Sequence, residues 1–561
     1  MSVVVRPLRC RRILPPSSLR VPHRVGPIGQ PNFLQQSFRR HRTTFPAPPR
    51  PAAQFEPQRS GLDSTTFLIA AAVSLGAAYI GLQYTTADTS AYTAAEEPKA
   101  TVALSAQEFN LVMAQEMPPG RPGNLTPEQE TKLKEMWAAL LDLCGVSHEQ
   151  NGTAAAVSSP TPAPRETSEK KTKKSRLSLF GKKDKEIGDS EAASGVDNDK
   201  HGQTKEFQQA LASLSPEALR DALWSMSKHD HPDALLLRFL RARKWDVQAA
   251  LVMLIATMHW RSQEMHLDDE IMMQGEGHAV RQANSSDLAE KKEGEDFLVQ
   301  MRLGKSFLHG VDKEGRPCCY VRARLHHGGE QSEKSLERLT VYTIETARML
   351  LRPPVDTATI VFDLTDFSMA NMDYTPVKFM IKCFEANYPE SLGSVIVYKS
   401  PWLFQGIWKI IKGWLDPVVA GKVHFASNPN DLEQWIPREH MMKELGGDED
   451  YVYQYVEPKE GEDAEMAKTA EKEPILAERK QLVDSFESET ISWMHGNDAG
   501  EGRLRLAQRL AENYWKLDPY VRAKSVYDRT GVLGPKGELD FYPEKKKPVP
   551  ASAGGANDEL D

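Results

Sequence analysis

The sequence has few cysteines, and none of them belongs to a paired motif. The five, Cys10, Cys144, Cys318, Cys319 and Cys383, are scattered along 561 residues. Secreted domains that depend on disulfides are dense in cysteine, so this pattern excludes a disulfide framework and is typical of a reducing, intracellular environment. The spacings that bind metals, such as H-E-x-x-H and C-x-x-C, are also missing. We therefore expect no metal and no other cofactor.

Sequence motifs of common enzymes are missing too. The run at 326–329 (HHGG) resembles an esterase oxyanion loop, but no G-x-S-x-G elbow accompanies it. Gly304, Lys305 and Ser306 resemble the end of a phosphate-binding loop. Val299 stands where the first glycine of that loop is required, so no backbone cradle can form. We expect a protein that is not an enzyme.

Acidic residues are missing from the start of the chain. Residues 1–55 contain ten arginines and no aspartate or glutamate, which is typical of a mitochondrial transit peptide and places such a segment at 1–62. The alternative is a disordered basic tail. Residues 64–87 follow as an uncharged run of 24 residues, long enough to span a bilayer as a helix. The two segments predict a single-pass membrane protein of mitochondria.

A first capped helix is predicted within residues 117–146. Thr126 suits the N-cap, Pro127 the first helical position and Gln129 the capping box. The helix has an apolar stripe, so we expect it to dock on the rest of the protein. The stripe consists of Leu133, Met136, Trp137, Leu140 and Leu141.

If translation starts at Met117, the protein is not anchored in mitochondria but is cytosolic and binds membranes peripherally.

Residues 149–205 are dense in Ser, Thr, Pro, Lys, Asp and Gly, which predicts a disordered linker. A basic run at 170–185 lies inside it, either as solvated charge or as a contact with anionic lipid, at about 1 kcal/mol per basic residue near the surface.

The rest of the chain predicts an α/β protein. Three capped amphipathic helices fall within 206–265, and strands alternate with helices over 297–455, which indicates a mixed or parallel sheet covered by helices. The strands are expected within PCCYVRARL, TATIVFDL, GSVIVYKS and KVHFAS, and helices at 333–352, 375–388 and 402–415. Residues 473–545 read as a helical C-terminal extension.

Six blocks of sequence resemble, in order, the CRAL-TRIO family of lipid-binding and lipid-transfer proteins. They include LLLRFLRARKWDVQAALVML in the helical part and NYPESLGSVIVYKSPWLF in the strand-helix part. The helix at 117–146 also looks like the opening segment of the fungal phosphatidylinositol-transfer members. The resemblance implies a small N-terminal helical subdomain and a sheet domain in which helices form a gated apolar lipid pocket. The blocks are 235–254, 312–321, 359–368, 387–404, 414–425 and 436–447.

The resemblance assigns the gate to residues 402–415, here called the gate segment. In this family the corresponding helix closes the pocket and meets the membrane. Tryptophans beside lysines suit a bilayer interface, although the pattern alone favours an ordinary helix that faces a core. The gate residues are Trp402, Leu403, Phe404, Ile407, Trp408, Ile411, Trp414 and Leu415.

The resemblance also implies a headgroup site made of Arg243, Lys244, Glu390 and Lys422. Cations bind a lipid phosphate and a carboxylate orients inositol hydroxyls, with Glu390 and Lys422 expected as a buried pair. The alternative is that Arg243 is solvated and that the pair is purely structural.

This sequence departs from the family at several positions. Val419 stands where threonine is common, and Ser391 where arginine is common. Hydroxyl residues linked to phosphatidylcholine binding are replaced near Ala358 and Ile360, so phosphatidylinositol is the expected ligand. The expected function is its binding and its transfer or presentation between membranes, by a monomer that contacts phospholipid and a membrane surface and no nucleic acid. Two alternatives remain: a carrier of another hydrophobic ligand such as a sterol, and a tether or adaptor that transfers nothing.

Overall fold

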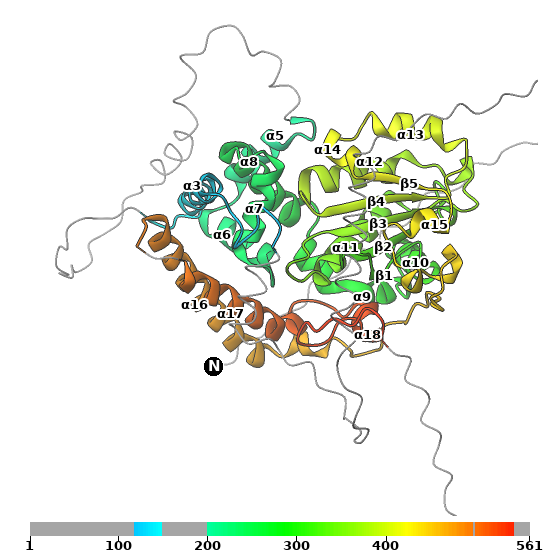
Figure 1. The fold of residues 1–561 in the computed structure, drawn as a ribbon. Coiled ribbons are helices and arrows are strands. Elements are labelled where there is room, and N and C mark those ends of the chain that lie inside the picture. Colours follow the sequence, from blue (N-terminus) through cyan, green and yellow to red (C-terminus); the bar gives the residue numbers. More distant parts are fainter. Residues whose placement is uncertain (1–116, 149–198, 498–499, 544–561) are drawn as a thin grey trace, which may run out of the picture. The chain divides into compact units, whose positions relative to one another are not determined.

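The computed structural model describes residues 117–148, 199–497 and 500–543 (Figure 1). All of them fall in one compact unit of the chain, residues 101–561. The predicted transit-like segment 1–62, the predicted span 64–87 and the predicted linker up to residue 198 lie outside the described residues. Within these ranges, no helix combines the length and the apolar character needed to cross a membrane.

The first described helix is α3 (Pro127–Leu143), and it begins with a complete capping box. The Thr126 hydroxyl accepts from the Gln129 backbone N–H, and the Gln129 side chain accepts from the Thr126 N–H. The whole predicted stripe is buried against α7 and α8, and the Trp137 indole donates to Asp233 at 2.8 Å. Helix α3 therefore docks on α7 and α8, which confirms that its stripe is buried against the rest of the protein. Helices α3 and α5–α8 together are here called the helical subdomain.

The other helices of this subdomain follow directly on residue 199. Helix α5 begins at Gln203, so the last three residues assigned to the linker, 203–205, are helical. Ser215 and Asp246 cap α6 and α8 through their side-chain oxygens. The bounds are α5 Gln203–Ser213, α6 Pro216–Ser227, α7 Pro232–Ala242 and α8 Val247–His259.

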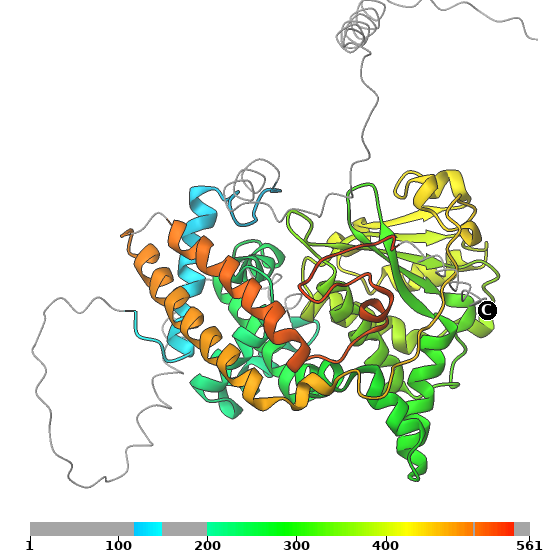
Figure 2. The same cartoon turned by 90° about the horizontal axis from the view of Figure 1, so that it is seen from below.

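Two long C-terminal helices complete the core of this subdomain. Helices α16 (Thr469–Met494) and α17 (Glu501–Leu517) lie side by side and pack on it, as both views show (Figures 1 and 2). Phe486 of α16 is fully buried between Trp137 and Trp224, with ring centroids 5.9 Å and 5.8 Å away. The extension is thus part of the hydrophobic core rather than an appendage.

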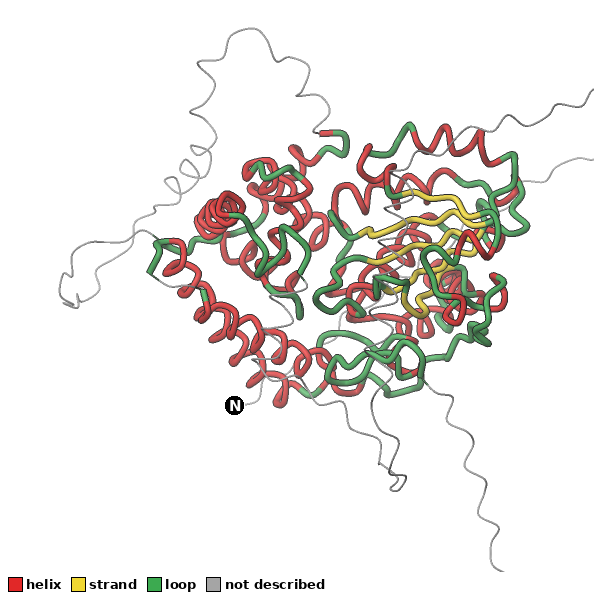
Figure 3. Tube along the Cα trace, in the orientation of Figure 1, coloured by secondary structure: helices red, strands yellow, loops and turns green. Residues whose placement is uncertain are grey.

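Five strands form one sheet, drawn in yellow in Figure 3, and their order is β1-β2-β3-β4-β5, as labelled in Figure 1. Strand β1 is antiparallel to β2, and the other neighbours are parallel. The predicted α/β fold class with a mixed sheet is confirmed. The strands are β1 Ser306–Val311, β2 Pro317–Arg322, β3 Ala358–Asp363, β4 Leu392–Tyr398 and β5 Val423–Ala426.

Successive side chains of each strand point to opposite faces of the sheet, because the side-chain period of a strand is two. Cys318, Val361 and Ile396 belong to a core on one face, with the segment around Leu432–Leu445. Cys319 and Ile360 point to the other face. That second face carries the functional cavity.

Helices cover the second face and the ends of the sheet. Helices α11 and α12 lie beside each other, and α12 continues as a π-helical turn, Cys383–Asn387. The remaining helices are α9 Met273–Ala283, α10 Leu288–Leu303, α11 Glu333–Met349, α12 Tyr374–Lys382, α13 Phe404–Lys412, α14 Pro417–Gly421, α15 Pro429–Leu432 and α18 Val526–Thr530.

Candidate lipid-binding cavity

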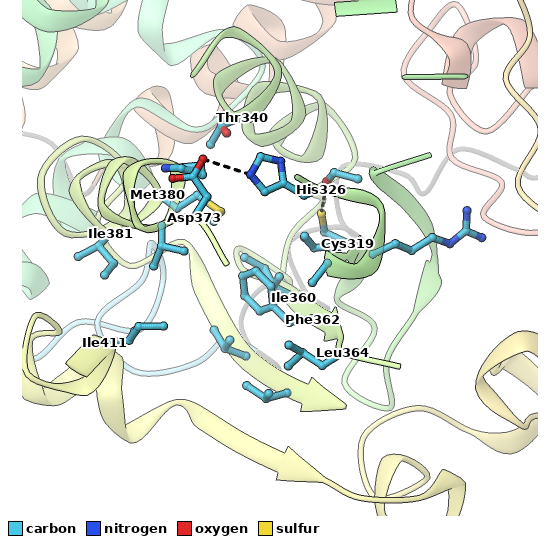
Figure 4. A pocket seen from close by; sticks show the side chains of 18 of the residues that line it. Cys319, His326, Thr340, Ile360, Phe362, Leu364, Asp373, Met380, Ile381 and Ile411 are labelled. Carbon is cyan, nitrogen blue, oxygen red and sulfur yellow. Dashed lines mark hydrogen bonds and ion pairs between the residues drawn. The ribbon is translucent and has the colours of Figure 1, made fainter. Parts of the chain in front are cut away.

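A cavity of about 290 Å³ lies between the second face of the sheet and helices α11, α12 and α13. Aliphatic and aromatic side chains from all of these elements form most of its wall, including Ile360, Phe362 and Leu364 of the β3 region (Figure 4). The apolar face expected for the 375–388 helix also lines it, with Val377, Met380, Ile381 and Phe384. Such a wall can hold a hydrocarbon chain, because burying apolar surface is favourable without directional bonds.

The gate segment closes one side of this cavity. Phe404, Trp408, Ile411 and Leu415 line the cavity. Ile407 is buried beside Phe404 in an adjoining apolar cluster. One face of helix α13 therefore forms a wall of the cavity, as expected of a helix that closes it.

The other predicted gate residues take different places. Leu403 is half-buried against the cluster around Phe404. Trp414 packs edge-on against Tyr374 of α12, with ring centroids 5.3 Å apart, and the Lys378 ammonium lies 4.9 Å from its ring. Trp402 is 87% exposed. The gate thus has an inner apolar face, a contact with α12 and an outer tryptophan.

The Glu385 carboxylate connects the end of the gate segment to the residues just before α5. One oxygen of Glu385 accepts from Lys200 at 2.7 Å and from His201 at 2.8 Å, and the other accepts from the Asp416 backbone N–H at 2.6 Å. Lys200 also donates to the Trp414 carbonyl. Burial alone would raise the pKa of Glu385, but these donors hold it below its ordinary value of 4.5. The charged carboxylate therefore ties the gate to the residues that precede α5.

Two of the predicted headgroup residues lie where β4 and β5 begin. Glu390 precedes β4 with a left-handed φ of 55°, and Arg238 donates to its carbonyl at 2.7 Å. Lys422 precedes β5, and its Nζ donates to the Leu392 carbonyl at 2.7 Å. The side chains of Glu390 and Lys422 form no ion pair in the described structure, so the two are close in the fold but not joined. Both remain able to bind another group.

Arg243 and Lys244 directly follow the last residue of helix α7 in the helical subdomain. Arg243 donates to the Gln203 side chain at 2.5 Å. Burial lowers its pKa, and Asp416 at the start of α14 opposes that effect, which places Arg243 near the segment that leads to Lys422. Lys244 is exposed. Of these two predicted headgroup residues, Arg243 is half-buried and lies near Asp416, whereas Lys244 faces solvent.

The cavity also has a polar end that the sequence did not reveal. His326 and Asp373 are hydrogen-bonded at 3.3 Å above the apolar wall (Figure 4). Lys305, Gln300 and Ser306 line the cavity as well. These residues come from separate loops, strands and helices, so only the folded chain brings them together.

Comparison with known proteins yields matches over most of the described chain. The model of the CRAL/TRIO domain matches residues 301–447, and that of the CRAL/TRIO N-terminal domain matches residues 203–256. A CRAL-TRIO domain-containing protein of Schizosaccharomyces pombe is 43% identical over 428 residues, 74% of this chain and 93% of the relative. Phosphatidylinositol transfer protein CSR1 of Eremothecium gossypii is 40% identical over 450 residues, 75% of this chain and 100% of the relative. The crystal structure of Sfh5 matches with 16% identity and a TM-score of 0.31, over 44% of this chain and 77% of that one.

Proposed function

The chain belongs to the CRAL/TRIO family, and on that premise we propose that it binds phosphatidylinositol in the cavity and transfers or presents it between membranes. One observation carries the proposal: an apolar cavity is closed by an amphipathic helix, and cationic side chains stand at one edge of it. Acyl chains fit the apolar part, and the phosphate needs the cations. The relative named as a phosphatidylinositol transfer protein matches over its whole length.

The headgroup is proposed to lie at the start of β4 and β5. Lys422 follows Val419 and precedes Val423, and both valines line the cavity, so an amine there is next to the point where acyl chains would enter. Glu390 stands two residues before the cavity-lining Leu392. We propose that Lys422 and Arg243 bind the phosphate and that Glu390 accepts from inositol hydroxyls. Lys244, which is exposed, acts only through its charge.

The outer face of the gate is proposed to contact the membrane. Trp402, Ile410 and Val418 are exposed by 87%, 47% and 56% of their surface. Lys409 and Lys412 are exposed on α13 beside Ile410, whereas Trp402 precedes this helix and Val418 lies on α14. Tryptophan prefers the bilayer interface and lysine is attracted by anionic lipid, so this surface suits a lipid membrane.

We propose a carrier that works as a monomer, without catalysis, without a cofactor and without nucleic acid. Among the described residues, no group of histidine, cysteine, aspartate and glutamate is arranged to hold a metal ion. Cys319 is buried, and burial raises the pKa of its thiol to about 11, which is unsuited to a nucleophile.

Native mass spectrometry of the purified full-length chain tests which ligand the cavity holds. We expect phosphatidylinositol to copurify in a one-to-one complex and to be released by organic solvent. A neutral lipid such as a sterol in its place would contradict the proposal and favour the second carrier hypothesis. An empty cavity, combined with no lipid uptake from vesicles, would favour a tether.

The location is proposed from the sequence outside the described residues. The arginine-rich start and the uncharged run 64–87 support a mitochondrial protein with one membrane anchor. An antibody against the C-terminal region should detect a carbonate-resistant band in mitochondria, slightly shorter than full length. A soluble cytosolic band of the size expected for a start at Met117 would contradict the anchored form.

A further inference from the structure

A second cation stands at the far end of the cavity from the proposed headgroup site. Lys305 directly precedes β1, whereas Lys422 directly precedes β5, and these strands are the two edges of the sheet. Four strand spacings of about 4.8 Å put the edges about 19 Å apart. Ser306 of β1 and Val423 of β5 both line the cavity, so the cavity runs across the whole sheet.

Lys305 is buried, with 5% of its surface exposed, and it lines the cavity. Its Nζ donates to the Gln331 side chain at 2.5 Å, and no described carboxylate forms an ion pair with it. The two acids that influence it, Asp296 and Glu330, are engaged by Lys292 at 2.9 Å and by His327 at 3.3 Å. A buried ammonium without an anion is expensive to maintain, and burial lowers the pKa of Lys305 below its ordinary value of 10.5.

Gln300 provides a second, independent observation at the same end. Its side chain is 1% exposed and lines the cavity. Its amide nitrogen donates to Ser335 at 3.0 Å and to the Asp296 carbonyl at 2.9 Å, while its Oε1 has no hydrogen-bond partner among the described residues. Buried polar atoms are nearly always satisfied, so an unpartnered acceptor facing a cavity indicates a ligand that donates there.

We propose that the Lys305 end of the cavity is a second lipid subsite, which binds an anionic oxygen group at the end of a single long apolar chain. The anion accepts from Lys305, and the chain lies along the apolar wall toward the gate. A carboxylate supplies the anion but, when ionised, has no proton to donate to Gln300 Oε1. A phosphate monoester supplies both, because its remaining P–OH can donate to that atom. The inference rests on the proposed function only in requiring that the cavity admits lipid.

The test compares three single-chain probes below their micelle concentrations: oleate, oleoyl lysophosphatidate and uncharged oleyl alcohol. Binding to the full-length chain is measured by isothermal titration calorimetry. We expect at least one of the two anions to bind at least about tenfold more tightly than the alcohol, the gain expected of a charge-assisted hydrogen bond in a buried site. Tighter binding of the lysophosphatidate assigns the subsite to phosphate, and tighter binding of oleate assigns it to carboxylate.

Lys305→Met removes the charge but keeps a long apolar side chain, and it should fold because no buried anion loses a partner. We expect it to bind the preferred anion at least about tenfold more weakly and the alcohol no more weakly than the wild type. Lys334→Met is the matched control, because the Lys334 side chain is 76% exposed on α11. Equal binding of anion and alcohol by the wild type would overturn the subsite, as would undiminished anion binding by Lys305→Met. If the proposed function is wrong, the protein does not transfer phosphatidylinositol while its preference for the anion persists. The two failures can therefore be told apart.

Discussion

At the scale of single residues, Glu345 of α11 is the centre of a buried ion-pair network that joins this helix to Arg261, in the turn that follows α8. Its side chain is fully buried, and it accepts from Arg261 at 2.7 Å and from Arg348 at 3.2 Å. Burial alone would raise the pKa of Glu345, but Arg261, Arg348 and Lys228 hold it well below its ordinary value of 4.5. Its charge is therefore part of the folded state.

We expect Glu345→Gln to lower the free energy of unfolding by about 3–5 kcal/mol, because it removes the closest counter-charge of two buried guanidinium groups, Arg261 and Arg348. Urea denaturation followed by circular dichroism measures the change. Glu135→Gln is the control: its exposed pair with Lys132 contributes at most about 1 kcal/mol. Similar unfolding midpoints for the Glu345 and Glu135 variants would show that the buried network does not stabilise the fold.

The same network determines in which direction the stability of the fold changes with pH. The folded-state pKa of Glu345 is depressed, so its contribution is present above about pH 4.5 and is lost as the pH falls through the folded pKa. The wild type should accordingly lose stability faster than Glu345→Gln when the pH is lowered from 5 to 3.

At the scale of elements, the gate segment combines two surfaces, one on helix α13 and one just before it. Its inner face closes the cavity, and Trp402 at its start is exposed beside it. Because Trp402 belongs to no described apolar cluster, its surface is available to a bilayer without any change in the core. A substitution there separates membrane binding from folding.

We expect Trp402→Ser to weaken binding to vesicles about tenfold without lowering the unfolding midpoint, because one interfacial aromatic side chain is lost. Vesicle cosedimentation over a range of lipid concentrations measures it, with anionic and neutral vesicles compared. Leu288→Ser is the control, since Leu288 is 82% exposed at the start of α10, in a different element from the gate. An equal loss of binding by both variants would contradict a specific gate contact.

At the scale of the whole molecule, the elements with strong local signals follow from the sequence and the apolar cavity follows from the resemblance to a family, but the polar end of the cavity follows from neither. GSVIVYKS has a continuous apolar run and was predicted as a strand, whereas β1 was missed because SFLHGV contains His309 and a glycine with φ 61°. Gly310 interrupts the register between β1 and β2, so no alternation is visible there.

The candidate site likewise has residues that could be predicted from the sequence and residues that could not. The gate residues and Lys422 both follow from resemblance to a family, because helical spacing alone favours a helix that faces a core. The polar end could not be predicted, because Lys305, Gln300 and His326 are brought together by a strand edge, a helix and a loop. The expected ion pair of Glu390 with Lys422 depended on side-chain geometry, and in the structure Lys422 donates to a backbone carbonyl instead.

The central claim is that this chain carries phosphatidylinositol with its headgroup at Lys422, and a transfer assay between liposomes tests it most directly. The full-length wild type should accelerate transfer of labelled phosphatidylinositol. Lys422→Ala and Glu390→Lys should abolish that transfer while circular dichroism shows an intact fold, and Lys132→Ala on the exposed face of α3 should transfer normally. Transfer at the wild-type rate by both folded headgroup variants, or no transfer by the wild type, would contradict the account.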